Sequence, residues 1–395
     1  MLTLLALAIL PGFDLAAYER PRVVMQAEAA LTAAPKTVTA ARNPRSAGGL
    51  HDFSSEGDYW WPDPKNPDGP YIQRDGMSNP DNFVAHRQAL LAFGRAFDAL
   101  AAAYSLTHDE KFATAAVSHL HAWFVDPETR MNPNLFYSQA IKGLNTGRSI
   151  GVIDTLHLCE VALGIEALRG AKAFSKDEEA AVTGWFREYL TWLTTHPYGV
   201  DESKAKNNHG TCAWLQIACF AHLTGDAEKL PAARTRFKEV LLPSQMAADG
   251  SFPEELRRTK PYGYSIFNLD VMTALAVVCS TPQENLMTWS LPDGRNLVRG
   301  VGWLAPFIAD KARWLKTVHR SAPGKKGDAE MTSEPVKPDV MYWDDWPVRQ
   351  PCLIFGALAA DNADWLATWK KLDAEPSVEE IIRNYPVRQP VLWMR

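Results

Sequence analysis

The side chains with the most distinct chemistry stand in two short segments of this sequence. The run KNNHG contains Asn208 and His209, and the segment EELRRTKPYGY contains Arg258 and Tyr264. An amide, an imidazole, a guanidinium and a phenol are together what the elimination of a uronic acid requires. Asn208, His209 and Arg258 can donate hydrogen bonds to the acid's carboxylate, which would stabilise the enolate-like charge left when the C5 proton is removed.

Tyr264 is the residue predicted to move that proton. A tyrosine with an ordinary pKa near 10 is a poor base at neutral pH, but a neighbouring positive charge favours the phenolate and lowers the pKa. Arg258 would supply this charge if the two side chains lie together. In a syn elimination, one phenol can take the proton and then return it to the departing glycosidic oxygen.

A second group of residues is predicted to bind neighbouring sugars. Arg87 and Arg148 suit bidentate binding of uronate carboxylates, with structural salt bridges as the alternative. His86 shares a helical stripe with apolar residues, which favours a hydrogen-bonded role on an inner face, although in a toroid that face also lines the cleft. The other candidates are a weaker amide, two loop tryptophans and a second phenol: Gln139, Trp60, Trp61 and Tyr262.

Two other functional classes stay open beside this hypothesis. Asn208 could cap a helix and His209 fill a polar gap, while the nearby arginines pair with Glu254 and Glu255. A glycoside hydrolase needs an acid and a carboxylate beside the scissile bond, and the candidate carboxylates are Glu56, Asp58, Asp63, Asp68, Asp75, Glu254 and Glu255. A non-catalytic carbohydrate-binding protein is compatible with the 14 tryptophans.

The elements that position these residues are predicted to be almost all helical. Apolar residues recur at steps of three and four through 79–104, and the tetrapeptides 107–110 and 175–178 are predicted capping boxes. Further helices are predicted at about 144–168, 211–223, 226–242, 265–280, 296–317 and 351–371. Many helices with Gly or Pro connections indicate stacked helical hairpins. The predicted fold class is all-α, an incomplete α/α toroid in one domain over 21–395, with a plain bundle as the alternative.

Two long segments, 34–78 and 319–346, do not fit the helical pattern. Both are rich in Gly, Pro, Asp and aromatic residues, and loops of this length inside a compact domain are commonly functional or disordered. Their aromatic residues favour ordered loops that wall a cleft: Tyr59, Trp60, Trp61, Tyr71, Tyr342, Trp343 and Trp346.

Composition limits the possible partners. The 395 residues are 46% apolar and 22% charged, which is typical of a globular protein. The 41 Lys and Arg residues against 46 Asp and Glu residues give a formal net charge of −5, which argues against nucleic-acid binding. No phosphate-binding glycine loop, HExxH pair or CxxC pair is present, so we predict no cofactor and no metal. After the N-terminus, no apolar run is predicted to span a membrane.

The N-terminal residues 1–20 begin with the apolar run LTLLALAILPGF. Its length and the small residues after it resemble a secretion signal, although a positively charged start is missing. We therefore expect a periplasmic or secreted protein. A buried first helix is the alternative.

Several motifs together resemble the alginate lyase superfamily of polysaccharide lyases. They are NNHG, DGSFPEELRRTKPYGYSIFNL, GLHDFSSEGDYWWPDP, NPDNFVAHR and GLNTGRSIGVIDT, so the likeness extends from about Ser46 to about Asp270. The resemblance implies an α/α toroid that cleaves an acidic polysaccharide by β-elimination without an organic cofactor. It also implies that Asn208 and His209 neutralise the substrate carboxylate, with help from Arg258, and that Tyr264 transfers the proton.

The sequence departs from the family pattern beside the tyrosine. Typical alginate lyases have a histidine there, whereas this chain has Gly263 before Tyr264 and Ser265 after it. The arrangement is more similar to a divergent branch that also includes glucuronan lyases. The expected substrate is therefore alginate first and glucuronan second, with Tyr262 as a second candidate phenol.

Overall fold

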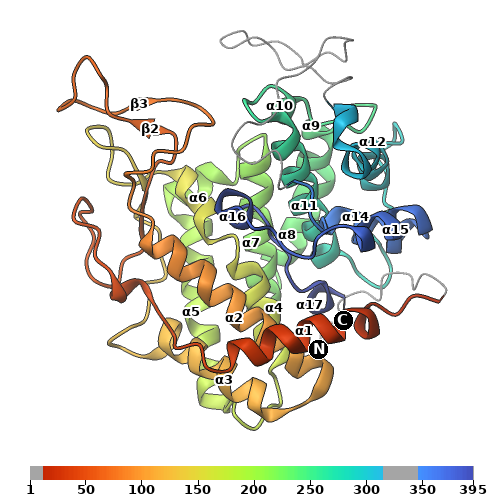
Figure 1. The fold of residues 1–395 in the computed structure, drawn as a ribbon, viewed down its shortest axis with the longest axis horizontal. Helices are drawn as coiled ribbons and strands as arrows, with labels where there is room; N and C mark the ends of the chain where they lie inside the picture. Colours follow the sequence, from red (N-terminus) through yellow and green to blue (C-terminus); the bar gives the residue numbers. More distant parts are fainter. Residues whose placement is uncertain (1–11, 315–345, 395) are drawn as a thin grey trace. The chain divides into compact units, whose positions relative to one another are not determined.

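Helices form most of the computed structural model, which describes residues 12–314 and 346–394 (Figure 1). Contacts between residues divide the chain into two compact units. The N-terminal unit comprises Ala16–Lys204 and Cys219–Asp226, and the C-terminal unit comprises the described parts of Met1–Leu15, Ala205–Ala218 and Ala227–Arg395. The predictions made for residues 1–11 and 315–345, including the end of the helix predicted at 296–317, lie outside the described residues.

The N-terminal unit contains helices that pack on α2. Its helices are α1 (Leu15–Ala30), α2 (Ala85–Thr107), α3 (Glu110–Leu120), α4 (Leu158–Ala167), α5 (Lys176–Thr195) and α6 (Pro197–Glu202), with a π-helical turn at His121–Val125 and 3-10 helices at Val38–Ala40 and Ser149–Thr155. α2 contacts both α3 and α4. Leu90, Phe93 and Phe97 of α2 are buried, which confirms the apolar stripe predicted from their spacing.

Two small sheets also belong to this unit. β1 (Ser54–Glu56) pairs in parallel with β4 (Tyr137–Ala140). β2 (Trp60–Trp61) pairs antiparallel with β3 (Ile72–Gln73), with Trp60 opposite Gln73. The loop predicted at 34–78 therefore contains three short strands, and β4 is an element that the sequence pattern does not predict.

The C-terminal unit is organised around α11 (Pro261–Cys279), in which every residue is buried. A helix that is apolar on nearly all sides belongs in a core, and α11 contacts α8, α12 and α14. The other helices are α8 (Lys229–Arg236), α9 (Leu242–Gln245), α10 (Pro253–Leu256), α12 (Leu297–Ala309), α14 (Pro351–Ala360), α15 (Ala363–Lys371), α16 (Glu379–Arg383) and α17 (Pro390–Trp393), with a π-helical turn at Phe237–Leu241 and a 3-10 helix at Lys311–Arg313. α7 (Asn208–Thr224) begins in this unit and ends in the other.

The two predicted capping boxes have different outcomes. Ser175 caps α5 as predicted, because its Oγ accepts the N–H three residues later at 3.1 Å. In the other box the cap is Asp109, whose carboxylate accepts the N–H two residues later at 3.1 Å. The predicted cap, Thr107, is instead the last residue of α2. His108 follows it with a φ of 55°, a left-handed conformation that ends the helix.

Two of the predicted helices are wrong in part. Within 144–168, Arg148 is extended, the next residues form the 3-10 helix Ser149–Thr155, and only the end of the segment is α-helical. The segment 351–371 is divided in two by Asp361, which has a φ of 50° and ends α14. In both segments the apolar spacing continues past a backbone conformation that breaks the helix.

The other predicted helices are found with shifted ends. The segments 211–223, 265–280 and 296–317 correspond to α7, α11 and α12. The segment 226–242 covers α8, the π-helical turn after it and the beginning of α9. As a result, Asn208 is the first residue of α7 and Tyr264 lies in the first turn of α11. Both residues belong to the site described below.

Two helices have the length and apolar content to span a membrane, which corrects the prediction that no such run follows the N-terminus. They are α2 and α11, and 78% and 100% of their apolar windows are buried inside the protein. Each therefore serves as a core helix of its unit.

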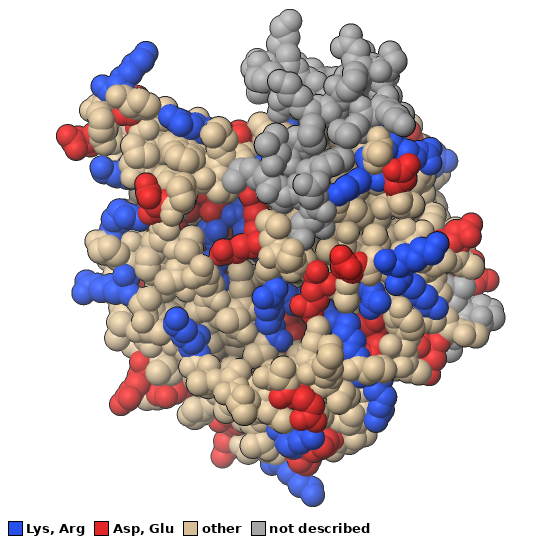
Figure 2. Space-filling model, viewed as in Figure 1, with Lys and Arg blue, Asp and Glu red and all other residues tan. Residues whose placement is uncertain are grey.

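On the face shown in Figure 2, basic and acidic side chains are interspersed, in keeping with the small formal net charge of −5.

Candidate active site

Asn208 begins α7 and is held by one buried carboxylate of the C-terminal unit. Its backbone N–H donates to Oε1 of Glu255 at 2.7 Å, and its Nδ2 donates to Oε2 of Glu255 at 2.8 Å. Asn208 is 1% exposed and Glu255 is fully buried. The first N–H groups of a helix have no partner within the helix and favour a negative charge, so a carboxylate suits this position.

The turn into α7 depends on a glycine. A Cβ on Gly210 would lie 2.0 Å from the carbonyl oxygen of Ala205, so a larger residue would force the backbone apart. His209 is half-buried, and its N–H donates to Oδ1 of Asn207 at 3.3 Å. The run KNNHG therefore folds as a tight turn that presents an amide and an imidazole at the start of a buried helix.

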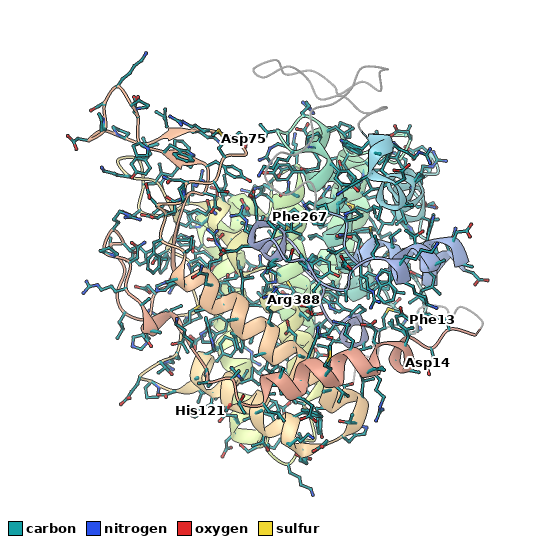
Figure 3. All side chains as sticks on the ribbon, in the orientation of Figure 1. Phe13, Asp14, Asp75, His121, Phe267 and Arg388 are labelled. Carbon is teal, nitrogen blue, oxygen red and sulfur yellow. The ribbon has the colours of Figure 1, made fainter. Side chains whose placement is uncertain are left out.

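Arg258 and Tyr264 lie in contact, which is the arrangement that the elimination hypothesis requires. Nη2 of Arg258 donates to Oη of Tyr264 at 2.8 Å, and its Cζ lies 3.9 Å from the centroid of the phenol ring. α10 ends before Arg258, and α11 begins at Pro261, a favoured first residue of a helix. Phe267, labelled in Figure 3, lies one turn after Tyr264 on α11.

Glu255 is the residue on which the charges of this site act. Burial raises the pKa of the Glu255 carboxyl, and this rise is opposed by the charge of Arg258, the hydrogen bonds from Asn208 and the charge of His209. Asn208 contacts Glu255 directly, His209 follows Asn208 in the chain, and the N–H of Arg258 donates to the Glu255 carbonyl at 3.1 Å, so these residues lie in one cluster. Tyr264 joins it through Arg258. These five residues are called the Glu255 cluster below.

A buried hydrogen-bond network joins α7, α9 and α11 next to this cluster. Oγ1 of Thr211, which has one hydrogen to donate, lies 3.1 Å from Oε1 of Gln245 and 3.0 Å from Oδ1 of Asn268. Nδ2 of Asn268 donates to the same Gln245 oxygen at 3.0 Å, and Nε2 of Gln245 donates to the carbonyl of Asn207 at 3.3 Å. Since Asn268 is one turn from Tyr264, the network fixes the start of α7 relative to α11.

Tyr262 and His86, two residues predicted to bind substrate, form hydrogen bonds with other groups of the protein. Tyr262 is fully buried, and its Oη donates to the carbonyl of Phe307 at 3.0 Å. Nδ1 of His86 accepts the N–H of Ser54 at 3.0 Å, and Nε2 donates to the carbonyl of Ala41 at 2.8 Å. Burial lowers the pKa of His86, which favours the neutral ring that these two bonds need. For His86, these contacts match the role that its helical stripe predicts, a hydrogen-bonded residue on an inner face.

The other predicted binding residues form a second buried cluster, in the N-terminal unit. Nη1 of Arg87 pairs with Oδ1 of Asp58 at 2.8 Å. Nε2 of Gln139 donates to Asp58 at 3.3 Å and to Asp154 at 3.2 Å, so this amide lies between two carboxylates. Arg148 donates to the carbonyl oxygen and to Oε1 of Gln139, both at 3.1 Å. These five residues are called the Gln139 cluster.

The Gln139 cluster holds its central residue in an uncommon conformation. Gln139 has a φ of 56°, in the left-handed region, and its N–H donates to Oγ of Ser55 at 2.8 Å. Burial raises the pKa of Asp154, while the charge of Arg87 opposes the rise and that of Asp58 adds to it. Among the described residues, Nε and Nη2 of Arg87 are buried and have no hydrogen-bond acceptor.

The loop tryptophans lie on β2, each beside a cation of the same unit. Cζ of Arg148 lies 5.7 Å from the ring centroid of Trp60, and Cζ of Arg74 lies 5.3 Å from that of Trp61. Nε1 of Trp61 donates to the carbonyl of Met77 at 2.7 Å. Both indoles are half-buried and held in place by these contacts.

Comparison with known families decides what kind of protein carries these two clusters. The sequence model of alginate lyases matches residues 37–314, which is more than half of the chain. The chain belongs to the alginate lyase family. The match includes both clusters and confirms the family resemblance of the motifs. No curated protein matches this chain.

Solved alginate lyases are similar to this family member in fold. An alginate lyase from Bacteroides ovatus is 30% identical, with a TM-score of 0.78 over 95% of this chain and 93% of that chain. Alginate lyase A1-III from Sphingomonas species A1 is 14% identical, with a TM-score of 0.54 over 96% of this chain and 94% of that chain. A variant of A1-III complexed with a tetrasaccharide is 15% identical, with a TM-score of 0.55 over 86% and 84%. The likenesses confirm the predicted all-α, α/α-toroid fold class.

Glu255 and Asp154 were not among the residues predicted for a lyase site, although Glu255 was a candidate carboxylate of the hydrolase alternative. The sequence suggests that Glu254 and Glu255 both pair with arginines, and Glu254 does pair with Arg257. Glu255 binds Asn208 instead, and no local pattern connects residues 47 positions apart. Asp154 stands in the run SIGVIDT, where a single carboxylate among apolar residues could have indicated a buried, partnered charge.

Proposed function

We propose that this alginate lyase family member cleaves a polyuronate by β-elimination, with alginate as the first substrate and glucuronan as the second. The family match and the likeness to an alginate lyase of Bacteroides ovatus support the proposal. The observation that carries it is the hydrogen bond of 2.8 Å from Arg258 to the phenolic oxygen of Tyr264. A cation in this position favours the phenolate, the form of tyrosine that accepts a proton.

The proposed reaction transfers one proton and breaks one carbon–oxygen bond. The phenolate oxygen of Tyr264 takes the proton from C5 of the uronate, and the electron pair of that C–H bond forms the C4–C5 double bond. The glycosidic bond at C4 breaks, and its electron pair leaves with the oxygen. The departing oxygen then takes the proton from the phenol, which returns Tyr264 to the phenolate.

The carboxylate of the same uronate is neutralised, in this proposal, by Asn208, His209 and Arg258. Loss of the C5 proton moves negative charge onto that carboxylate, so donors fixed in advance stabilise the transition state more than the ground state. Nδ2 of Asn208 uses one hydrogen on Glu255 and has a second one for the substrate. This donor set suits an acidic sugar better than a neutral glycan.

The Gln139 cluster is proposed as a second uronate-binding region. Arg87 has two guanidinium nitrogens without an acceptor among the described residues, and Arg148 is half-buried beside the ring of Trp60. With Gln139 and Trp61, these side chains offer donors for a carboxylate and aromatic surface for a sugar ring. The tetrasaccharide complex of A1-III supports binding of an oligosaccharide by a protein of this fold.

The hydrolase alternative receives less support from the candidate carboxylates. Glu56 forms a two-pronged ion pair with Arg45, and Asp58 pairs with Arg87. Glu254 and Glu255 are also engaged, by Arg257 and by Asn208. An acid and a base free to flank a glycosidic bond are therefore not apparent among these four described residues.

An exported location, periplasmic or secreted, stays a prediction from the apolar start of the sequence.

The test compares two phenols in the same protein. The wild type, Tyr264→Phe and Tyr262→Phe are incubated with alginate, glucuronan and a neutral glycan, and the ultraviolet absorbance of the new conjugated double bond is followed. We expect the wild type to act on a polyuronate and Tyr264→Phe to lose about 10²–10⁴-fold in kcat, the usual contribution of a general acid–base group.

Each phenol variant has a distinct meaning in that comparison. If Tyr262→Phe loses turnover while Tyr264→Phe keeps it, the buried phenol is the base and the proposed assignment is wrong. If none of the polyuronates gains absorbance with the wild type, elimination itself is excluded. Retained binding of the polymer by a folded Tyr264→Phe variant separates a loss of chemistry from a loss of affinity.

A further inference from the structure

We infer that Glu255 is a positioning residue for the elimination, which orients the Asn208 amide toward the substrate's carboxylate. The inference rests on the proposed function, because it assigns Glu255 a role in that same reaction. Its basis is that both oxygens of Glu255 accept hydrogen bonds from Asn208, one from the backbone at 2.7 Å and one from Nδ2 at 2.8 Å.

The carboxylate decides which end of the amide faces it. An ionised carboxylate only accepts hydrogen bonds, so it selects Nδ2 of Asn208 and excludes Oδ1 from this side. Because the same carboxylate also holds the backbone N–H, the side chain and the start of α7 are fixed together. Among the described residues, Nδ2 donates only to Glu255, which leaves its second hydrogen for a substrate oxygen.

Water is poorly placed to replace this contact. Glu255 is fully buried and Asn208 is 1% exposed, so an amide that loses the carboxylate has no solvent to hold the same orientation. Of the two arginines that the sequence suggests as partners, Arg257 pairs with Glu254 at the surface and Arg258 donates to Tyr264. The two adjacent glutamates thus have separate roles, one at the surface and one on the donor that the reaction uses.

The inference predicts an effect on turnover that passes through Asn208. Glu255→Gln keeps the size of the side chain but replaces one acceptor by an NH₂ group, which faces an Asn208 donor. We expect kcat to fall about 10–100-fold, the range for loss of one hydrogen bond to a charged group, with a smaller change in KM. The larger effect on kcat is expected because the Asn208 bond strengthens as charge develops on the substrate.

A double-mutant cycle tests this route directly. Glu255→Gln, Asn208→Ala and the double variant are assayed on the polyuronate that the wild type cleaves fastest. If Glu255 acts through Asn208, the double variant has about the same kcat as Asn208→Ala alone, within roughly twofold. A double variant whose loss equals the product of the two single losses would overturn the inference, because Glu255 would then act independently.

A matched control and a second variant keep the test decisive. Glu254→Gln makes the same chemical change at the adjacent, surface position and should keep the wild-type kcat. If Glu255→Gln does not fold, as judged by circular dichroism, Glu255→Asp replaces it in the cycle with the same expected non-additivity. A wild-type kcat in folded Glu255→Gln would overturn the inference while the elimination proposal stands, whereas an inactive wild type would overturn both.

Discussion

The two buried polar clusters contain similar side chains but pair them differently. In the Glu255 cluster, the arginine binds a phenol at 2.8 Å and the carboxylate binds an amide at 2.8 Å. In the Gln139 cluster, Arg87 binds a carboxylate at 2.8 Å, and the amide of Gln139 lies between two carboxylates. A guanidinium thus contacts an oxygen that can gain and lose a proton in one cluster, and an anion of the protein in the other.

This difference separates two uses of a buried arginine. Beside a phenol, a positive charge favours the phenolate, and in the proposed function this charge serves the elimination. Beside buried carboxylates, it offsets the cost of removing their charges from water and serves stability. Removal of the arginine should therefore be detected by different measurements in the two clusters.

The largest expected effects come from replacing each arginine by methionine. Arg258→Met removes the donor to the phenolic oxygen, so kcat/KM on the polyuronate should fall about 10²–10³-fold, as for loss of one oxyanion donor. Arg87→Met leaves Asp58 and Asp154 buried without that cation, so the free energy of unfolding should fall by about 3–5 kcal/mol. Both quantities are measured on both variants by absorbance assays and denaturant titration.

Either of two results would contradict these different roles of Arg87 and Arg258. An Arg87→Met protein as stable as the wild type would mean that Asp58 and Asp154 do not depend on the arginine. An Arg258→Met protein with wild-type turnover would remove the cation from the chemistry. Arg74→Met is the matched control, because Arg74 lies over Trp61 and is not in either cluster, so only a small change in stability is expected.

A smaller effect is expected at a buried acid outside both clusters. Burial raises the pKa of Asp270 from 3.8 to about 7, although the N–H of Cys352 donates to it at 3.0 Å. Between pH 4 and 7 the unfolded chain ionises this group while the folded protein keeps it protonated, so stability falls as the pH rises through this window. The fall should total roughly 4 kcal/mol, and Asp270→Asn should remove it.

The control for this prediction is an exposed acid. The hydrogen bonds from Arg295 lower the pKa of Asp293 below its usual value, so its contribution to stability is lost only at lower pH. Asp293→Asn should therefore leave the slope of the free energy of unfolding between pH 4 and 7 unchanged. If Asp270→Asn keeps the wild-type slope, Asp270 does not titrate in this window. The slope would then be assigned to Asp154 and Glu255, whose pKa values burial also raises.

The parts of the fold that the sequence predicts are those governed by helical spacing. The stripe of α2 and the Ser175 cap are local patterns, and both are found. For α1 the sequence predicts only a buried first helix, as the alternative to a secretion signal in 1–20. Glu19, Val23 and Ala27 are buried at steps of four, but a charged residue and small side chains give a weak apolar signal. The break at Asp361 depends on a left-handed backbone that apolar spacing does not encode.

In the candidate site too, a contact between residues close in the sequence could be predicted, whereas a contact between distant residues could not. The segment around Arg258 and Tyr264 is short, so a contact between the two side chains could be expected from the sequence. The pairing of Asn208 with Glu255 joins α7 to α10, and adjacent arginines suggested other partners for the carboxylate. His86 was the ambiguous case, because an inner-face position suits both a ligand contact and the hydrogen bonds that it makes.

The most direct measurement of the central claim counts two products of one reaction. The purified protein is incubated with alginate, and conjugated double bonds and new reducing ends are quantified in the same samples over time. Elimination with Tyr264 as base and acid predicts one double bond for each new reducing end, and both signals should be lost together in Tyr264→Phe. New reducing ends without double bonds, or double bonds that form equally fast in Tyr264→Phe, would contradict the account.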